Sequence, residues 1–188
     1  MLERANQNKA KAKADNALFI ESNITKIGLP DLIADCIISN CVVNLVPEEE
    51  KQLVFNEMFR LLKPGGRVAM SDILLKKDLT PELKANVALY VGCVAGASKV
   101  QDYETYLQRA GFSGVRIADS NVDLNVYYGA KEENSVGGCC GEGSVQACCE
   151  KSPSCCNMEG TDLDHLSDLS MMDLNELAGS FRVYAVKA

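Results

Sequence analysis

The sequence predicts an α/β protein whose sheet is largely parallel and whose C-terminal part is an irregular, Cys-rich tail. Three observations carry this prediction. Residues 34–38 form a short β-branched run that is apolar on both faces, as in strands buried within parallel sheets. An amphipathic helical pattern follows over residues 51–62, and a second apolar run spans residues 67–75. A strand, a helix and a strand in this order imply parallel pairing through a right-handed connection.

Length and charge restrict the function classes. The chain has 188 residues, enough for one domain with an appendage, and its net charge of −7 argues against binding to nucleic acid. The N-terminus lacks the apolar core of a secretory signal, and no stretch approaches the roughly eighteen apolar residues of a membrane span. We therefore expect a cytoplasmic protein without nucleic-acid or membrane partners.

The N-terminal segments precede the first buried strand. Residues 1–14 are rich in Ala, Lys and Gln and predict a solvated helix. Residues 16–20 predict a short strand, which ends in the polar turn 21–23 and an apolar position at Ile24. A loop around Pro30 would then lead into the buried strand.

The central helix has clear start and stop signals. Pro47 suits a first helical position, and three glutamates at residues 48–50 place negative charge where the helix dipole favours it. The sequence KPGG at residues 63–66 ends the helix before the next strand. These signals support a helix that packs on a sheet.

Further elements complete the predicted domain. A second helical region begins near Thr80 and contains the segment LYVGCVAGA, residues 89–97. A third helix spans residues 100–110. The apolar runs 114–117 and 125–130 predict a terminal β pair that closes the sheet.

The C-terminal part is a different kind of sequence. Between residues 131 and 180 stand ten acidic residues against two lysines, without a periodicity that could build a core. We expect three regions: a domain over residues 1–130, a Cys-rich acidic tail over 131–178, and a terminal strand over 179–188 that docks on or near the sheet.

Six cysteines of the tail stand in adjacent pairs. Adjacent thiols can bind thiophilic ions such as trivalent arsenic, and a loop could collect several of them. The alternative is a disordered thiol-rich tail that oxidises. Zinc is less favoured because CxxC spacings are missing, and we interpret His165, the only histidine, as a solvated side chain. The pairs are Cys139 with Cys140, Cys148 with Cys149, and Cys155 with Cys156.

Cys41 stands just past the predicted strand 34–38. In open α/β sheets the carboxyl ends of the strands form the edge where ligands bind. A free cysteine is also a small hydrophobe that is often buried, and this alternative stays open for Cys41 considered alone. We assign Cys36, inside the strand, to the core, and we interpret Asp72 as structural.

Two motifs together resemble the arsenite methyltransferases: ISNCVVNL at residues 38–45 and LYVGCVAGA at residues 89–97. The helix ending LLKPGGR before a strand is similar to a recurrent feature of class I S-adenosylmethionine-dependent methyltransferases. The resemblance covers residues 1–130. It implies a Rossmann-like class I methyltransferase sheet in a partial methyltransferase domain, and arsenic detoxification by arsenite methylation.

The resemblance also implies site residues. Cys41 and Cys93 would be the catalytic thiols that bind trivalent arsenic, a soft acceptor that thiolates suit. Asn23 and Ile24 would lie near the adenine of S-adenosylmethionine, and Asn40 near its methionine part. Ordinary turn chemistry is the alternative for the asparagines. The implied partners are arsenite or its thiol conjugates, a thiol reductant, and a thiol-reducing protein.

The chain departs from the family pattern on the side that binds the methyl donor. In that family a first strand is followed by a Gly-rich turn, and a second strand ends in an acidic residue that holds the ribose of S-adenosylmethionine. This chain has no Gly-rich turn before Gly65 and lacks that acidic residue. We therefore expect an N-terminally incomplete member that exposes a sheet edge and an apolar face, and binds S-adenosylmethionine weakly or not at all. The alternatives are a non-catalytic thiol-based metalloid-binding protein and a methyltransferase for a small organic acceptor.

Overall fold

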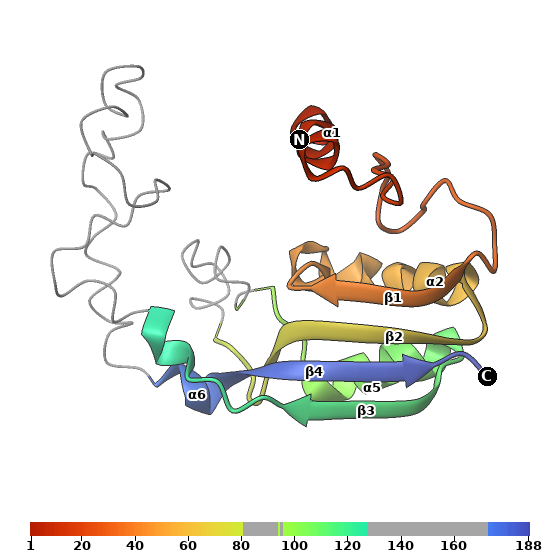
Figure 1. Ribbon diagram of the computed structural model, residues 1–188. Helices are drawn as coiled ribbons and strands as arrows, with labels where there is room; N and C mark the ends of the chain where they lie inside the picture. Colours follow the sequence, from red (N-terminus) through yellow and green to blue (C-terminus); the bar gives the residue numbers. More distant parts are fainter. Residues whose placement is uncertain (81–93, 95, 128–172) are drawn as a thin grey trace, which may run out of the picture.

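Four strands form one sheet in the part of the chain that the structure describes. The computed structural model describes residues 1–80, 94, 96–127 and 173–188. The strands are β1 (Ala34–Asn40), β2 (Leu62–Leu75), β3 (Ser113–Asp119) and β4 (Ala178–Val186). Their order in the sheet is β1-β2-β4-β3 (Figure 1). β1 pairs parallel with β2, whereas β4 runs antiparallel to β2 and to β3.

Two helices cover one face of this sheet. α2 (Lys51–Leu61) connects β1 to β2, and α5 (Val100–Ala110) precedes β3 (Figure 1). Short 3₁₀ turns, η1 (Val43–Leu45) and η2 (Glu48–Glu50), join β1 to α2. The strand–helix–strand unit predicted from the sequence is therefore confirmed, as are the helices expected over residues 51–62 and 100–110.

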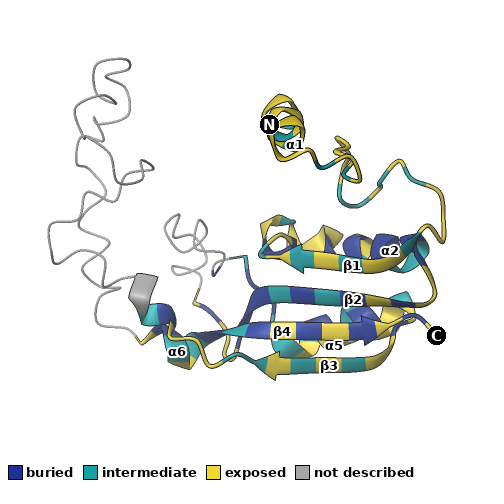
Figure 2. Cartoon of the chain, viewed as in Figure 1, coloured by how far each residue is buried: buried dark blue, intermediate teal, exposed yellow. Residues whose placement is uncertain are grey.

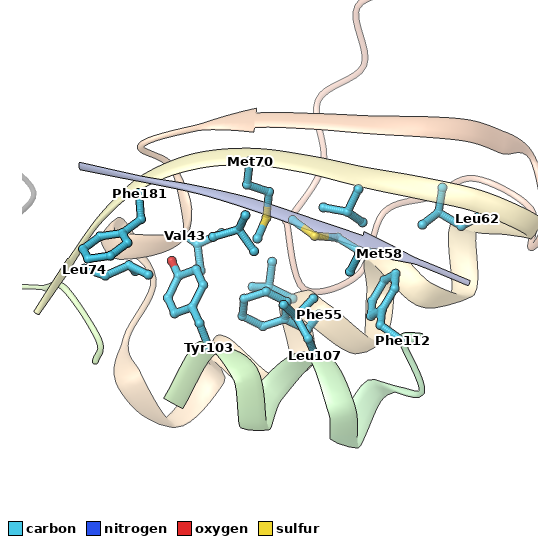
Figure 3. Close-up of a cluster of buried hydrophobic side chains, with 14 residues drawn as sticks. Val43, Phe55, Met58, Leu62, Met70, Leu74, Tyr103, Leu107, Phe112 and Phe181 are labelled. Atoms are coloured by element: carbon cyan, nitrogen blue, oxygen red, sulfur yellow. The ribbon is translucent and has the colours of Figure 1, made fainter. Parts of the chain in front are cut away.

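The main core lies between the sheet and these helices. The rings of Phe55 and Tyr103 meet edge to face with centroids 5.2 Å apart, and Phe59 meets Phe112 in the same way at 5.2 Å. Such pairs contribute about 0.5–1.5 kcal/mol beyond their buried area. Figure 3 shows how aromatic and aliphatic side chains from α2, α5, β2 and β4 fill this layer.

The turn between α2 and the regular part of β2 requires glycine twice. Gly65 has φ of 78°, a left-handed conformation that side chains disfavour. A Cβ atom on Gly66 would lie 2.8 Å from the carbonyl oxygen of Lys63. The KPGG sequence thus allows the chain to leave α2 and enter β2 within a few residues.

The opposite face of the sheet is exposed. We call it the open face and define it by Cys36, Ile38, Asn40, Tyr184 and Val186. Ile38 pairs with Ala69, which pairs with Tyr184, so these residues share a face. Ile38 is 81% exposed and Tyr184 44% exposed (Figure 2). Among the described residues, the expectation of an uncovered apolar face is therefore confirmed.

The prediction that Cys36 belongs to the core is wrong. Cys36 is exposed, because it lies on the open face beside Ile38 rather than on the face that α2 covers. The apolar pattern on both sides of β1 predicted two buried faces, but in the described residues only one face of β1 is covered.

The predicted strand over residues 16–20 is also wrong. After α1 (Leu2–Ala12), which buries no residue, these positions have no regular structure, and Leu18 is 78% exposed. A strand needs neighbouring backbone groups for its hydrogen bonds, and these residues pair with no strand in the structure. Ile24, which follows this segment, packs against the main core.

None of the described helices has the length and apolar character needed to cross a bilayer.

The last two strands differ in part from the predicted β pair. The run 114–117 lies within β3 as expected, but residues 124–127 form the 3₁₀ turn η3 (Leu124–Tyr127). The partner of β3 is β4, which follows the short helix α6 (Leu174–Leu177). The prediction that the terminal strand docks on the sheet is confirmed, and β4 takes a central position between β2 and β3.

Candidate functional site

Cys41 lies directly after β1, at the carboxyl edge of the parallel pair. Its amide N–H donates to the carbonyl of Ser71 on β2 at 2.9 Å, and its side chain is partly buried. Its φ of 51° places a non-glycine residue in the left-handed region. This conformation costs about 1–2 kcal/mol in an L-residue, and such residues cluster at functional sites. The predicted position of Cys41 at the strand end is thus confirmed.

A buried polar cluster packs beside this turn. The hydroxyl of Tyr103 on α5 lies 3.2 Å from Oδ1 of Asn44 and 3.3 Å from Oδ2 of Asp72 on β2. Asn44 Nδ2 donates to the carbonyl of Ile73 at 2.7 Å, which fastens η1 to β2. The cluster lies close to Cys41, whose amide donates to the carbonyl of Ser71, the residue before Asp72. Burial is the main cause that raises the pKa of Tyr103, and the charge of Asp72 adds to it.

Asp72 is the unusual member of this cluster. It is fully buried, and its Oδ1 accepts no hydrogen bond from the described residues. Burial raises its pKa to about 6, although hydrogen bonding from Tyr103 and the charge of Lys51 oppose the shift. The sequence-based interpretation of Asp72 as structural anticipated neither this burial nor this pKa.

A second network surrounds Lys51 at the start of α2. Lys51 is 1% exposed, and its Nζ donates to Glu48 Oε2 at 2.7 Å, to the carbonyl of Gly96 at 2.5 Å and to Ser98 Oγ at 2.7 Å. Burial raises the pKa of Glu48, but hydrogen bonds from Lys51 and Tyr106 outweigh it, so this pKa is lowered. Sequence reasoning missed Lys51, because a lysine at a helix start ordinarily points into solvent.

A cavity of about 530 Å³ is lined by residues 44–51 and by residues 96–99, the two segments that the hydrogen bonds of Lys51 connect. Its lining carries charges of both signs, from Glu48, Lys51 and Lys99, together with the amide of Asn44. Cys41 is not among the residues that line it. The cavity therefore combines charged groups with a largely apolar wall, and it lies next to the thiol turn rather than around it. Its other lining residues are Val46, Pro47, Leu75, Asp78, Gly96, Ala97, Ser98 and Asp102.

The two asparagines predicted to contact S-adenosylmethionine lie in different surroundings. Asn23 Oδ1 accepts from the amide and the hydroxyl of Thr25, both at 3.0 Å, as in an ordinary Asx turn. Asn40 is exposed at the end of β1, next to Cys41. The structure does not show Asn23 and Asn40 sharing a pocket.

The remaining predicted ligands fall outside the described residues. These are Cys93 and the three vicinal cysteine pairs of the tail. Among the residues that the structure does describe, no group of three or more His, Cys, Asp or Glu side chains could hold a metal ion. Their roles as ligands stay predictions.

The fold and the sequence together define the class of protein. A family model described as "Methyltransferase domain" matches residues 1–111, so the chain belongs to this methyltransferase family. The predicted class I methyltransferase fold is confirmed by solved methyltransferases of similar structure.

Particular relatives are arsenite methyltransferases. The one from Halobacterium salinarum is 42% identical over 118 residues, which are 63% of this chain and 30% of that relative. The one from Homo sapiens is 34% identical over 113 residues, which are 58% of this chain and 30% of that relative. The chain thus spans about 30% of the length of these curated relatives. The solved arsenic(III) S-adenosylmethionine methyltransferase from Chlamydomonas reinhardtii has a TM-score of 0.55 at 21% identity, covering 91% of this chain and 44% of that one.

Proposed function

We propose that this chain takes part in methyl transfer from S-adenosylmethionine to trivalent arsenic, with Cys41 and Cys93 as the arsenic-binding thiols. The observation that carries the proposal is the position of Cys41, partly buried in a left-handed turn at the carboxyl edge of β1. It stands within the segment that resembles arsenite methyltransferases, and curated proteins of that name align over more than half of the chain.

The chemistry suits thiols at this place. Trivalent arsenic is a soft acceptor and prefers sulfur ligands to oxygen ligands. Each cysteine thiol that binds arsenous acid replaces one hydroxyl group, which leaves as water with the thiol proton. Two protein thiols leave the arsenic lone pair available, and S-adenosylmethionine supplies an electrophilic methyl group. A thiol reductant would keep the cysteines reduced.

The described residues suit the binding of the methyl donor, S-adenosylmethionine, less well than the binding of the methyl acceptor, trivalent arsenic. Asn40 is exposed beside Cys41, but the Asn23 carbonyl oxygen is already engaged within its own turn. We therefore propose that this chain binds arsenic more readily than S-adenosylmethionine. A non-catalytic thiol-based arsenic-binding protein is the second candidate function, and the same observation favours it.

One incubation separates these candidates. The chain is mixed with labelled S-adenosylmethionine, arsenite and a thiol reductant, and arsenic species are separated by chromatography. Methylated arsenic that is lost in Cys41→Ser and Cys93→Ser supports the enzyme, whereas bound but unmethylated arsenite supports the second candidate. Cys36→Ser is the matched control, because Cys36 is an exposed thiol on the open face. The same comparison is made in a chain whose six tail cysteines are replaced by Ser, and arsenic binding that survives there in both site variants would overturn the proposal.

Donor binding is measured separately by calorimetry. We expect no saturable heat on titration of S-adenosylmethionine into the chain, because Oδ1 of Asn23 is already engaged by Thr25 and no Gly-rich turn precedes Gly65. Micromolar binding would contradict the weak-donor proposal and favour a complete donor site.

A further inference from the structure

The open face of the sheet combines apolar side chains with positive charge. We propose that this face binds an amphipathic helix of a partner protein, and that this helix carries aspartate or glutamate beside its apolar stripe. The inference does not depend on the proposed arsenic chemistry, because none of the residues that support it is a predicted arsenic ligand.

Three exposed arginines lie on the same side of the sheet as the open face. Arg67 pairs with Val186 and Arg116 pairs with Tyr184, and both partners belong to the open face. Arg182 precedes Tyr184 by two residues on β4, and side chains two residues apart along a strand point to the same side. All three arginines are exposed. We call these three residues the arginine patch.

The arginine patch has no counter-charge in the part of the chain that the structure describes. None of the ion pairs there involves these guanidinium groups. In the register of the strands, from the row of Cys36 to the row of Asn40, this side of the sheet carries no aspartate or glutamate. A partner that brings carboxylates can therefore form charge-assisted hydrogen bonds with all three arginines, and Arg suits such paired contacts well.

The middle of the open face can be covered by a helix but not extended by a strand. β2 pairs with β1 on one side and with β4 on the other, and β4 pairs with β2 and β3. Both inner strands thus already pair along both edges, and their faces offer side chains only. Helices are the elements that cover the faces of sheets with parallel strands. Ile38 and Tyr184, which are 81% and 44% exposed, supply the apolar contact.

The size of the open face matches a short helix. Across the four strands it spans about 14 Å, and from Cys36 to Asn40 it spans about 13 Å along β1, measured between Cα atoms. A helix of about ten residues is about 15 Å long. Beyond this area the same side is already covered, because Ile73 on β2 packs in a second buried cluster with Leu124 and Leu174.

Charge separates an acidic helix from other occupants. The chain has a net charge of −7, which repels nucleic acid and anionic membranes over a wide area. A second copy that docks by its own open face brings two arginine patches close together, which is unfavourable. A single helix contacts only this face, and salt screens the exposed charges beyond about 8–10 Å.

The test uses the full-length chain and two synthetic fluorescent peptides of about eighteen residues, long enough for several helical turns. Both have leucine at heptad positions a and d. The first has glutamate at positions e and g, and the second has glutamine there. Fluorescence anisotropy should show that the glutamate peptide binds about tenfold more tightly, and that added salt reduces this difference. The overall charge of the chain predicts the opposite preference.

The double variant Arg116→Glu with Arg182→Glu should weaken binding of the glutamate peptide about tenfold or more, because two attractions become repulsions. Arg109→Glu is the matched control and should bind as the parent does. Arg109 is an exposed arginine on α5, which covers the other face of the sheet (Figure 1). Bound glutamate peptide should also protect Cys36, an exposed thiol of the open face, from alkylation by iodoacetamide.

Several outcomes would overturn the inference. These are equal binding of the two peptides, undiminished binding in the double variant, and a stable dimer that the double variant dissociates in sedimentation. Binding of the parent to phosphatidylglycerol vesicles, without binding to the glutamate peptide, would assign the face to a membrane instead. Should the double variant not fold, Arg116→Gln with Arg182→Gln removes the charges without reversing them. Weaker binding there supports the inference, and unchanged binding overturns it.

Discussion

The hydroxyl of Tyr103 on α5 lies 3.3 Å from Oδ2 of Asp72 on β2, and both residues are fully buried. This contact places a buried carboxyl group, whose Oδ1 accepts no hydrogen bond from the part of the chain that the structure describes, beside the turn that carries Cys41. It links the core to the candidate site, because the same hydroxyl also reaches Asn44 in that turn.

Asp72 should make stability depend on pH in an unusual direction. Its pKa is 3.8 when exposed and about 6 in the folded chain, so between these values the folded state holds the proton more tightly than the unfolded state. The contribution of Asp72 to the unfolding free energy should therefore fall as the pH rises from 4 to 7. This fall is about 2 kcal/mol, at 1.36 kcal/mol per pKa unit.

Asp72→Asn removes this component, and urea unfolding at several pH values measures it. The stability of the variant relative to the parent should increase as the pH rises. Asp119→Asn is a control of opposite sign: the pKa of Asp119 is lowered, since contacts from Asn121 and Lys76 outweigh burial. That variant should lose stability at neutral pH and recover towards the parent in acid. Parallel curves for Asp72→Asn and the parent would contradict the expected burial of Asp72.

The left-handed conformation of Cys41 predicts that glycine replaces it better than serine. Glycine relieves about 1–2 kcal/mol of conformational cost but adds about 0.5–1 kcal/mol of backbone entropy. Cys41→Gly should thus exceed Cys41→Ser in stability by up to about 1.5 kcal/mol, as measured by urea unfolding. With the six tail cysteines replaced by Ser, both variants should also bind arsenite more weakly than their parent. A clearly less stable glycine variant would argue against the φ of 51°.

The open face should promote self-association. Ile38 is 81% exposed on this face, so Ile38→Thr should reduce sedimentation-detected association and dye binding without loss of stability. Ile37 on the same strand packs against the main core, and Ile37→Thr should destabilise the fold by about 1–3 kcal/mol. Equal effects of the two substitutions would show that both faces of β1 are covered in solution.

Arg60 should hold the segment before β1 in place. Its guanidinium binds both carboxylate oxygens of Glu57, and it donates to the carbonyls of Ile27 and Leu29 at 3.0 and 2.9 Å. Arg60→Lys cannot reproduce this fork of donors. Amide hydrogen exchange over residues 23–33 should become about tenfold faster, because fewer contacts oppose local opening.

Arg4→Lys is the control for Arg60, since Arg4 lies on α1, which buries no residue. We expect its exchange pattern to match that of the parent. Unchanged exchange in Arg60→Lys would mean that the contact of Ile27 with Glu57, at 2.6 Å, is sufficient to hold the segment.

Local signals predicted the β1–α2–β2 unit well. The glutamates after Pro47 and the glycines at 65 and 66 affect only the backbone a few residues away. The sequence pattern alone is therefore enough to predict where the helix begins and ends. The position of Cys41 follows from the end of β1 in the same way.

Long-range contacts decided the features that the sequence did not predict. The burial of Lys51 depends on Gly96 and Ser98, which lie 45 and 47 residues away. The apolar pattern of β1 predicts a core position for Cys36, but the exposure of this residue depends on which elements cover each face of the strand. The central placement of β4 likewise depends on pairing partners more than a hundred residues earlier in the chain.

The placement of β4 has a consequence for how the chain folds. β4 is the last of the four strands to be synthesised, yet it lies between β2 and β3 and is the strand with which β3 pairs. During translation, β1, α2 and β2 can assemble early, while β3 must wait for β4 to emerge. Chaperone dependence and premature aggregation should therefore be greatest in nascent chains that already contain β3 and still lack β4.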